Sequence, residues 1–344
     1  MKSGLKKNDE APAFAFARVW QANAEIYGPG DSLNRYTVTS VSVQRFNPAK
    51  PFVICGSICL KFVRHQIAHL MRDPSPYKTI AVASTFSPRF KQVLAEAKRI
   101  RERFSAHLHL IYVGEGDEET AKKFRDALAQ LQLPPDSAIH YEKGTPAEAI
   151  LGALAREKID MIVAGALEKE AVLHPFLGNV ARRLVREARC AVMLFTRPAI
   201  KPRPLRRIVF VADYSDQGLQ ALKRTLPFAA AESCERLYVI RIITTFDQAR
   251  ESIRVSAKGH EKPRAEDEEA AVEEFVLSAG ATDVPIEARC IRGNTGLAAS
   301  DFVQSVKADL LVVPLQKSAG AIQQLPSNIA WVTDVIPCNL WVIR

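Results

Sequence analysis

The chain carries a short polar turn twice, each time directly after a run of apolar residues. The first turn begins at Thr85 after residues 80–84, and the second begins at Asp213 after residues 208–212. In an open parallel sheet, ligands bind beyond the carboxyl ends of the strands, where the connections change direction. The turn recurs because a longer strand-and-helix unit occurs twice in the chain. In each copy of this unit, two segments are therefore expected to converge on a ligand: the turn after its first strand and the loop after its fourth strand.

A group of cysteine and histidine residues near the N-terminus has spacings that resemble a metal site. Cys55 and Cys59 are four residues apart, and so are His65 and His69. However, only five residues separate Cys59 from His65, far below the roughly twelve of a two-Cys, two-His zinc finger. We therefore expect no metal site.

Sequence signatures of catalysis are absent. The chain has no G-x4-G-K-[ST] loop, no G-x-S-x-G turn and no H-E-x-x-H helix. His107, His109 and His140 lie on expected strands without a neighbouring acidic motif, so we interpret them as structural. His174 is interpreted as a surface residue. The sequence predicts a protein that is not an enzyme, with weak ATP hydrolysis as the most that it would support.

The elements that must position these turns alternate regularly along the chain. In the first copy the expected strands are 78–84, 107–113, 137–142, 159–164 and 190–196, and the expected helices are 88–104, 118–132, 146–157 and 178–188. Residues 159–164 form a continuous apolar run, which is typical of a strand covered on both faces. Strict alternation predicts a parallel sheet with helices on both sides.

The second copy repeats the same events in the same order. Its expected strands are 206–212, 236–243, 284–291, 308–313 and 338–343, and its expected helices are 216–232, 264–279, 295–306 and 327–334. Gly144 and Gly293 mark equivalent turns before a helix, and Asp160 and Asp309 each precede a buried strand. Self-similarity at this length indicates a duplicated domain and not a solenoid.

Four segments follow from these patterns. Residues 77–197 form the first repeat, 198–204 a proline-rich linker, and 205–344 the second repeat. Residues 1–76 match neither repeat. This extension is either accessory or lies upstream of the natural start, for which Met71 is suitably placed.

Both repeats resemble universal stress protein domains, and together they resemble a tandem member of that family over about residues 76 to 344. The resemblance implies an α/β fold of two doubly wound, parallel five-stranded sheets, of the type also found in adenine nucleotide alpha hydrolases. It further implies that the repeats pack through their last strands, Ala191–Thr196 and Leu340–Arg344, as an intramolecular pseudo-dimer. Covering these apolar edges is physically reasonable. Two chains are then expected to form a homodimer.

The resemblance also implies where a nucleotide would bind. In the family the first strand ends in Asp, which addresses adenosine, and a G-x2-G-x9-G-[ST] loop follows the fourth strand. Glycines let backbone N–H groups approach phosphate, and a helix N-terminus favours its charge. In the first repeat Thr85 replaces the Asp, Gly165 and Gly178 remain, Glu168 replaces the middle glycine, and Asn179 replaces the hydroxyl residue. This site should bind ATP poorly.

The second repeat departs from the pattern differently. It retains Asp213 and has Ser215 two residues later. At the four fixed positions of the loop pattern, where the family has three glycines and a hydroxyl residue, it has Pro314, Lys317, Ser327 and Asn328. Pro314 lacks an N–H donor, and Lys317 would supply only a point charge. Asn179 and Asn328 either cap their helices or contact an anion or a partner.

Composition limits the class of protein. The 344 residues include six cysteines and carry a net charge of +9, and no apolar run approaches the roughly 18 residues of a membrane span. Such scattered cysteines favour a reducing cytosol, and we interpret Cys190 and Cys338 as core residues. Nine basic residues lie in 182–207 against Glu187 alone; they form either a solvated helix face and linker or a contact for an anionic surface.

The sequence therefore predicts a cytoplasmic, non-catalytic universal stress protein with degenerate nucleotide loops and no cofactor. Its expected role is to bind or regulate other macromolecules, with unidentified protein partners and not with nucleic acid or membranes. The alternative is a stress sensor that binds ATP or AMP in one degenerate site.

Overall fold

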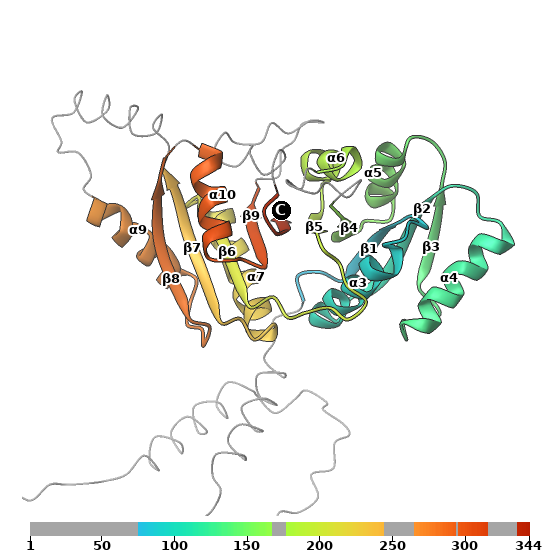
Figure 1. The fold of residues 1–344 in the computed structure, drawn as a ribbon, viewed down its shortest axis with the longest axis horizontal. Coiled ribbons are helices and arrows are strands. Elements are labelled where there is room, and N and C mark those ends of the chain that lie inside the picture. The colour runs from blue at the N-terminus through green and yellow to red at the C-terminus, as the bar shows by residue number, and fades with distance from the viewer. Residues whose placement is uncertain (1–74, 167–176, 244–264, 294, 316–335) are drawn as a thin grey trace, which may run out of the picture. The chain divides into compact units, whose positions relative to one another are not determined.

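The computed structural model describes residues 75–166, 177–243, 265–293, 295–315 and 336–344 (Figure 1). The cysteine and histidine group at residues 55–69, His174, and the helix expected at 327–334 lie outside the described residues.

The first repeat alternates strands and helices in the predicted order, and each predicted boundary lies within two residues of the observed one. Its elements are β1 (Thr79–Ser84), α3 (Phe90–Phe104), β2 (His107–Val113), α4 (Glu118–Gln130), β3 (Ala138–Glu142), α5 (Pro146–Arg156), β4 (Met161–Gly165), α6 (Asn179–Glu187) and β5 (Ala191–Phe195).

The described part of the second repeat follows the same sequence of elements. They are β6 (Arg207–Val211), α7 (Asp216–Ala231), β7 (Arg236–Ile243), α9 (Ala265–Ser278), β8 (Ile286–Arg292), α10 (Thr295–Ser305), β9 (Leu310–Pro314) and β10 (Asn339–Ile343).

Side-chain hydrogen bonds explain where two of the helices, α4 and α7, begin. Asp117 caps α4, because its carboxylate accepts a hydrogen bond of 2.7 Å from the backbone N–H of Thr120. Ser215 caps α7 in the same way, accepting from the N–H of Gly218 at 2.9 Å. Both side chains satisfy N–H groups that a helix leaves without a partner at its start.

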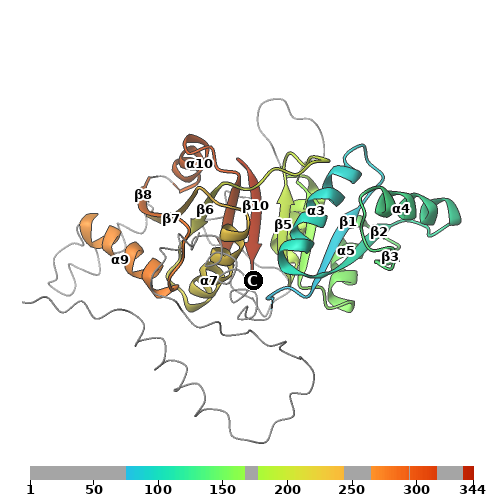
Figure 2. The same ribbon diagram turned by 90° about the horizontal axis from the view of Figure 1, so that it is seen from below.

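The two five-stranded parallel sheets that the sequence predicts join edge to edge into one continuous sheet. The strand order is β3-β2-β1-β4-β5-β10-β9-β6-β7-β8 over ten strands. Neighbouring strands within each repeat are parallel, and the two halves meet where β5 pairs antiparallel with β10. Figure 2 shows these two strands side by side. The last strands therefore join the repeats as an intramolecular pseudo-dimer, as predicted.

The junction has approximate two-fold symmetry. Met193 and Trp341 are each the third residue of their strand, and they lie directly opposite each other in the register. Leu194 lies opposite Leu340, and Val192 opposite Val342. Equivalent positions meet at the centre of the junction, as in the interface of a symmetric dimer.

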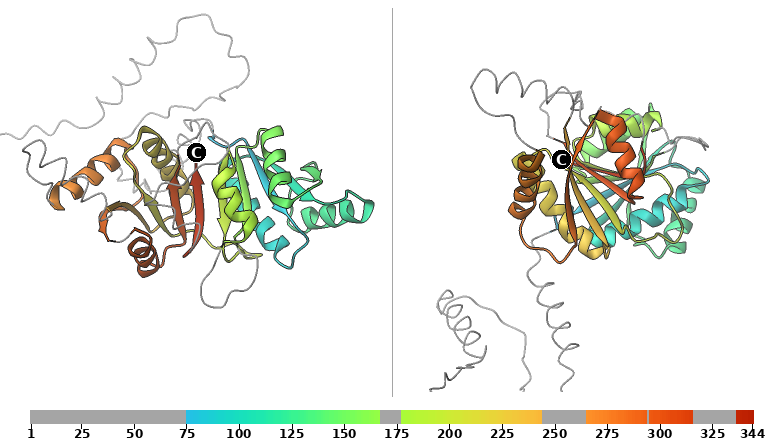
Figure 3. Two further views of the ribbon diagram at one scale, coloured as in Figure 1. Left: turned by 90° about the horizontal axis from the view of Figure 1, so that it is seen from above. Right: turned by 60° about the vertical axis from the view of Figure 1, so that its left-hand side comes forward.

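Helices cover both faces of the sheet (Figures 1 and 3). The side chains of α3, α4, α7 and α9 pack into one hydrophobic core, and those of α5, α6 and α10 into another. Along β1, Ile80 and Val82 point into the first core, and Ala81 points into the second. This alternation explains why the strands read as continuous apolar runs.

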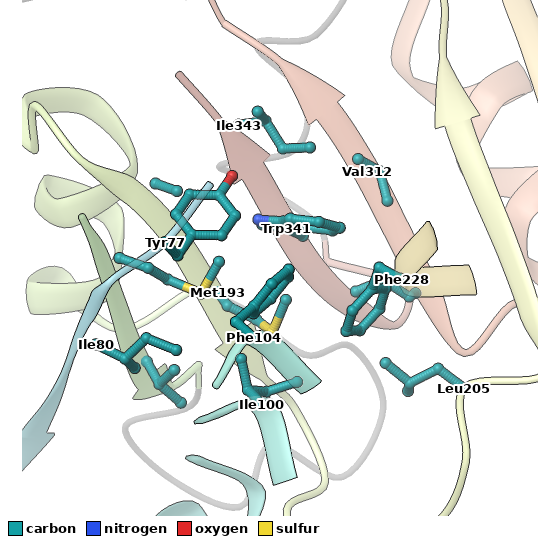
Figure 4. Packing of buried hydrophobic residues seen from close by; sticks show 14 of the residues in the cluster. Tyr77, Ile80, Ile100, Phe104, Met193, Leu205, Phe228, Val312, Trp341 and Ile343 are labelled. Atoms are coloured by element: carbon teal, nitrogen blue, oxygen red, sulfur yellow. The ribbon is translucent and has the colours of Figure 1, made fainter. Parts of the chain in front are cut away.

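Trp341 lies at the centre of the junction and is fully buried (Figure 4). Its ring centroid lies 5.0 Å from that of Phe228 in the second repeat, 5.9 Å from Phe104 and 6.1 Å from Tyr77 in the first. The same figure shows Tyr77 beside the indole ring of Trp341, and burial raises the pKa of Tyr77 to about 12. The two repeats therefore share one aromatic core.

A buried carboxylate also connects the repeats. Glu232, at the end of α7, accepts hydrogen bonds from the guanidinium groups of Arg99 and Arg103 on α3, the latter at 2.7 Å. It accepts a third from the backbone N–H of Leu205, at 3.0 Å. The Glu232 side chain is fully buried, so these donors replace the water it loses on folding.

Candidate functional site

The strand order reverses between β1 and β4 in the first repeat and between β6 and β9 in the second. Val82 pairs with Val163, and Phe210 pairs with Val312. Continuing each register by three residues places Thr85 level with Ala166 and Asp213 level with the residue after β9. The predicted turns therefore lie beside the ends of the fourth strands, where an open parallel sheet binds ligands.

Aromatic rings surround the turn of the first repeat. Thr85 is exposed, and the next residue, Phe86, packs its ring 4.7 Å from Phe124, 5.2 Å from Tyr112 and 5.5 Å from Phe90 between ring centroids. Offset and edge-to-face contacts at these distances add stabilisation beyond the buried area. The turn is thus held by packing against the protein's own rings.

The cluster extends along the ends of β2 and β3. Tyr141 at β3 lies 6.3 Å from Tyr112 and 6.4 Å from Phe124. A Cβ on Gly116 would lie 2.7 Å from the Tyr141 ring, so this position needs glycine for the chain to pass the ring. This cluster was not predicted from the sequence, although aromatic residues at or just after the ends of three neighbouring strands were its signal.

Gly165 and Gly178 lie close together in the first repeat, although twelve residues separate them in sequence. The N–H of Gly178 donates to the carbonyl of Ala166 at 3.0 Å, and the N–H of Ala166 donates to the carbonyl of Phe195 at 2.9 Å. Both N–H groups are therefore already hydrogen-bonded within the protein.

The interpretation of Asn179 as a helix cap is wrong. Gly178 occupies the N-cap position of α6, and the exposed Asn179 is the first helical residue. A side chain at this position lies one residue too late to serve as the N-cap. The predicted cap at Asn328 falls outside the described residues.

In the second repeat Asp213 and Ser215 interact directly. The Asp213 carboxylate accepts hydrogen bonds from the N–H of Ser215 at 3.1 Å and from its hydroxyl at 2.8 Å. A Cβ on Gly218 would lie 1.9 Å from the Asp213 oxygen, so glycine is needed for this close approach. The carboxylate that the sequence resemblance would assign to adenosine is here bonded to its own turn.

Tyr214, between these residues, has a backbone φ of +55°, an uncommon conformation for a bulky residue. Its ring lies 4.9 Å from the Arg241 guanidinium and 5.6 Å from Phe275. Arg241 also donates to the carbonyl of Ala212 at 3.3 Å. Burial raises the pKa of Tyr214 to about 12, so the phenol is neutral at physiological pH.

The end of β9 is closed by hydrogen bonds to its neighbours. The N–H of Leu315 donates to the carbonyl of Ile343 at 2.8 Å, and Gln217 donates to the carbonyl of Leu315 at 2.7 Å. Pro314 is buried and pairs with Ile343. Lys317 and Asn328 lie outside the described residues, so the second loop stays a prediction from sequence.

The basic residues of 182–207 do not form one surface. Arg183 pairs with Glu187, and Arg206 pairs with Glu235. Arg189 precedes β5 and Arg197 follows it, so these two lie at opposite ends of a strand. Ion pairs and this separation reduce the field that a polyanion would meet.

The part of the chain that the structure describes holds neither a candidate metal site nor a membrane-spanning helix. Within the described ranges, no group of three or more His, Cys, Asp or Glu side chains is arranged to hold a metal ion. Among the helices that the structure describes, none has the length and apolar character needed to cross a membrane.

Comparison with known proteins extends these observations. The sequence model of the universal stress protein family matches residues 76–196 and again residues 204–344. A universal stress protein of Thermus aquaticus is 35% identical over 135 residues, which is 34% of this chain and 98% of the relative. One from Methanocaldococcus jannaschii is 27% identical over 142 residues, covering 36% of this chain and 84% of the relative.

Solved structures show a similar fold over both repeats. A protein of unknown function from Pseudomonas aeruginosa aligns with a TM-score of 0.55 and 17% identity, covering 78% of this chain and 92% of its own. A universal stress protein from Archaeoglobus fulgidus aligns with a TM-score of 0.55 and 13% identity, covering 79% of this chain and 99% of its own.

Proposed function

Because this chain belongs to the universal stress protein family, with two domains of that family in tandem, we propose that it acts in the stress response without catalysing a reaction. In this proposal it is a cytoplasmic protein that binds or regulates other macromolecules. Its nucleotide loops are degenerate remnants of the family's site.

The observation that carries this proposal is the aromatic packing in the first repeat. Phe86 contacts three other rings where the turn after β1 would meet a nucleoside. Phe86 is 37% exposed, so a ligand would meet the edge of this cluster and could reach further only by displacing packed rings, at the cost of their contacts and buried area. The N–H of Gly178, which the family's loop pattern would direct at a phosphate, is already hydrogen-bonded within the protein. This bond supports the same conclusion.

The alternative function is adenine-nucleotide binding with slow ATP hydrolysis, and one observation favours it. Asp213 and Ser215 form a compact polar turn at the end of β6, where the family places the residue that addresses adenosine. A ribose hydroxyl would have to exchange hydrogen bonds with Ser215 to reach this carboxylate. Hydrogen-bond exchange is nearly neutral in free energy, so this site would bind a nucleotide more readily than the first.

Calorimetry and native mass spectrometry of the purified full chain with AMP, ADP and ATP would test the proposal. We expect no stoichiometric binding. Micromolar binding of one nucleotide per chain would overturn the proposal in favour of the alternative. Asp213→Ala and Gly178→Glu would then show which repeat holds the ligand.

Assembly and partners form part of the same proposal. We expect a homodimer, which sedimentation velocity at several protein concentrations would detect. Binding to DNA or to acidic lipid vesicles should be absent or should disappear as salt is raised, since any residual attraction would come from unpaired surface arginines. Tight binding that persists at high salt would contradict this part.

A further inference from the structure

Two histidines on neighbouring strands face each other in the first repeat. The Nδ1 atom of His109 on β2 lies 2.9 Å from the Nε2 atom of His140 on β3. Their rings are parallel within 1°, with centroids 5.2 Å apart. This distance is that of a hydrogen bond, which requires that one nitrogen carries a proton and the other does not.

The pair is connected to the surface by a chain of charged groups. Glu157, directly after α5, places its carboxylate oxygen 3.6 Å from the other nitrogen of His140. Arg156 donates to Glu157 at 2.9 Å and also binds Glu142 on β3. The expectation that these histidines have no acidic neighbour is therefore wrong, because the carboxylate comes from an element that is distant in sequence.

The hydrogen bond between the rings is compatible with at most one positive charge on the pair. The Glu157 carboxylate, 3.6 Å from His140 Nδ1, is complementary to one such charge. A second proton would place two cations 2.9 Å apart and remove the only acceptor between them. Burial, followed by His140 and then by His107, lowers the pKa of His109, while Glu157 opposes this shift. On β1, the residue opposite His109 is the uncharged Ala81.

We propose that the pair formed by His109 and His140 is an acid-sensitive latch for β3 and the end of α5. Above about pH 6.5, the ordinary value for histidine, the hydrogen bond holds the two strands and the helix end together. Acidification makes both rings cationic, and the repulsion between the two positive charges separates the rings. Because β3 is an outer strand of the sheet, it can loosen without disturbing the junction of the repeats.

The direction of the pH effect follows from linkage. A histidine whose pKa is lowered by folding binds fewer protons in the folded than in the unfolded state. Its contribution to stability is therefore complete above the unfolded pKa and is lost as the pH falls toward the folded pKa. Loosening an edge strand frees its backbone N–H and C=O groups for pairing with another chain. Acidification would thus be a trigger for the proposed macromolecular binding, although the latch itself does not depend on that function.

The second repeat provides an internal control. The positions equivalent to His109 and His140 hold Tyr238 and Arg289, as the strand registers show. Tyr238 packs on Phe302 of α10 at 5.6 Å, and Arg289 pairs with Glu287. The outer strand β8 therefore has no histidine pair and should respond little to acid.

Hydrogen exchange of the full chain at pH 7.5 and pH 5.0, expressed as protection factors, tests the proposal. We expect protection in β3 and the end of α5 to fall about tenfold at pH 5.0, and protection in β8 to change by less than about threefold. His109→Gln keeps a hydrogen-bonding side chain that does not titrate, so it should abolish the tenfold loss. His107→Gln, an exposed position on the same strand, removes only the weakest of the groups that lower the pKa of His109, so most of the loss should remain.

Histidine NMR titration of the unmodified chain gives a second, independent measurement. Two coupled histidines should titrate in two separated steps, one below the ordinary value near 6.5. Ordinary single titrations of both residues would overturn the latch. So would an unchanged protection of β3 at pH 5.0, or an equal loss in the wild-type chain and His109→Gln.

Discussion

At the scale of single residues, Glu232 is a buried carboxylate whose ion pairs connect the two repeats. Its side chain is fully buried, and its hydrogen bonds come from two arginines of the other repeat and from the backbone before β6. Arg99 is also largely buried, with 11% of its side chain exposed. Arg99 also pairs with Glu96, so removing Glu232 would leave this guanidinium with one carboxylate partner in place of two, and would leave the N–H of Leu205 without this acceptor.

We therefore predict that Glu232→Ala lowers the free energy of unfolding by about 3–5 kcal/mol, the cost of breaking a buried ion pair from one side. Glu235→Ala is the matched control, because Glu235 pairs with Arg206 in an exposed position, where such a pair contributes about 0–1 kcal/mol. Urea unfolding measures both. Equal effects of the two substitutions would show that the buried carboxylate has no special role.

A second residue-scale prediction concerns Gly218 in the first turn of α7. Replacing a helical glycine by alanine normally stabilises a protein by about 0.5–1 kcal/mol. Here the new Cβ would lie 1.9 Å from the Asp213 carboxylate and would disrupt its bonds to Ser215, each worth about 1.5–3 kcal/mol. Gly218→Ala should therefore destabilise the protein by about 1 kcal/mol or more.

The double variant with Asp213→Ala separates these effects. Without the carboxylate, the nearest atom to the new Cβ is Ser215 Oγ at 3.3 Å, a contact that a small shift can relieve, so Gly218→Ala should become nearly neutral or stabilising in that background. A thermodynamic cycle of urea unfolding free energies gives the coupling directly. If Gly218→Ala has the same effect in both backgrounds, the observed close approach is not what makes glycine necessary.

At the scale of elements, the pairing of β5 with β10 covers the strand edge that each repeat would otherwise expose, and it places side chains of both strands in a shared core. Trp341 contacts rings that come from both repeats, and a large aromatic side chain at such a junction accounts for much of its buried area. Met193, opposite it, is equally buried. The junction thus depends on side chains that an isolated repeat would expose.

Trp341→Ala should consequently lower the free energy of unfolding by about 3–5 kcal/mol, as expected for a fully buried tryptophan. Leu277→Ala provides the comparison, because Leu277 is 78% exposed and its removal should change stability by less than about 0.5 kcal/mol. Chemical denaturation followed by circular dichroism is the measurement. A loss below about 1 kcal/mol for Trp341→Ala would mean that the junction contributes little to folding.

At the scale of the whole molecule, local patterns predicted the elements and their order, because apolar runs such as Ile208–Val211 and turn residues such as Gly144 act over a few neighbours. The contacts of the histidine pair and of the junction, in contrast, depend on distant residues. His109 and His140 are 31 residues apart, and Arg99 and Glu232 are 133 apart. Pairing of this kind follows from strand register and helix packing, which one sequence does not specify.

The antiparallel junction leads to a prediction about the whole sheet. In an isolated repeat β5 or β10 would be an edge strand, and edge strands open more often than central ones. In the ten-stranded sheet both are central, while β3 and β8 lie at the edges. Amide hydrogen exchange at pH 7.5 should therefore show β5 and β10 within about tenfold of β1 and β6, and all four far slower than β3 and β8.

This exchange experiment also reports how tightly the repeats are coupled. Opening of the junction would require separation of the Trp341 core and loss of the Glu232 ion pairs together, so it should approach the free energy of global unfolding. Glu232→Ala should then accelerate exchange in β5 and β10 more than in β1. If β5 and β10 already exchange as fast as the edge strands in the wild-type chain, the repeats separate readily and the sheet is not one cooperative unit.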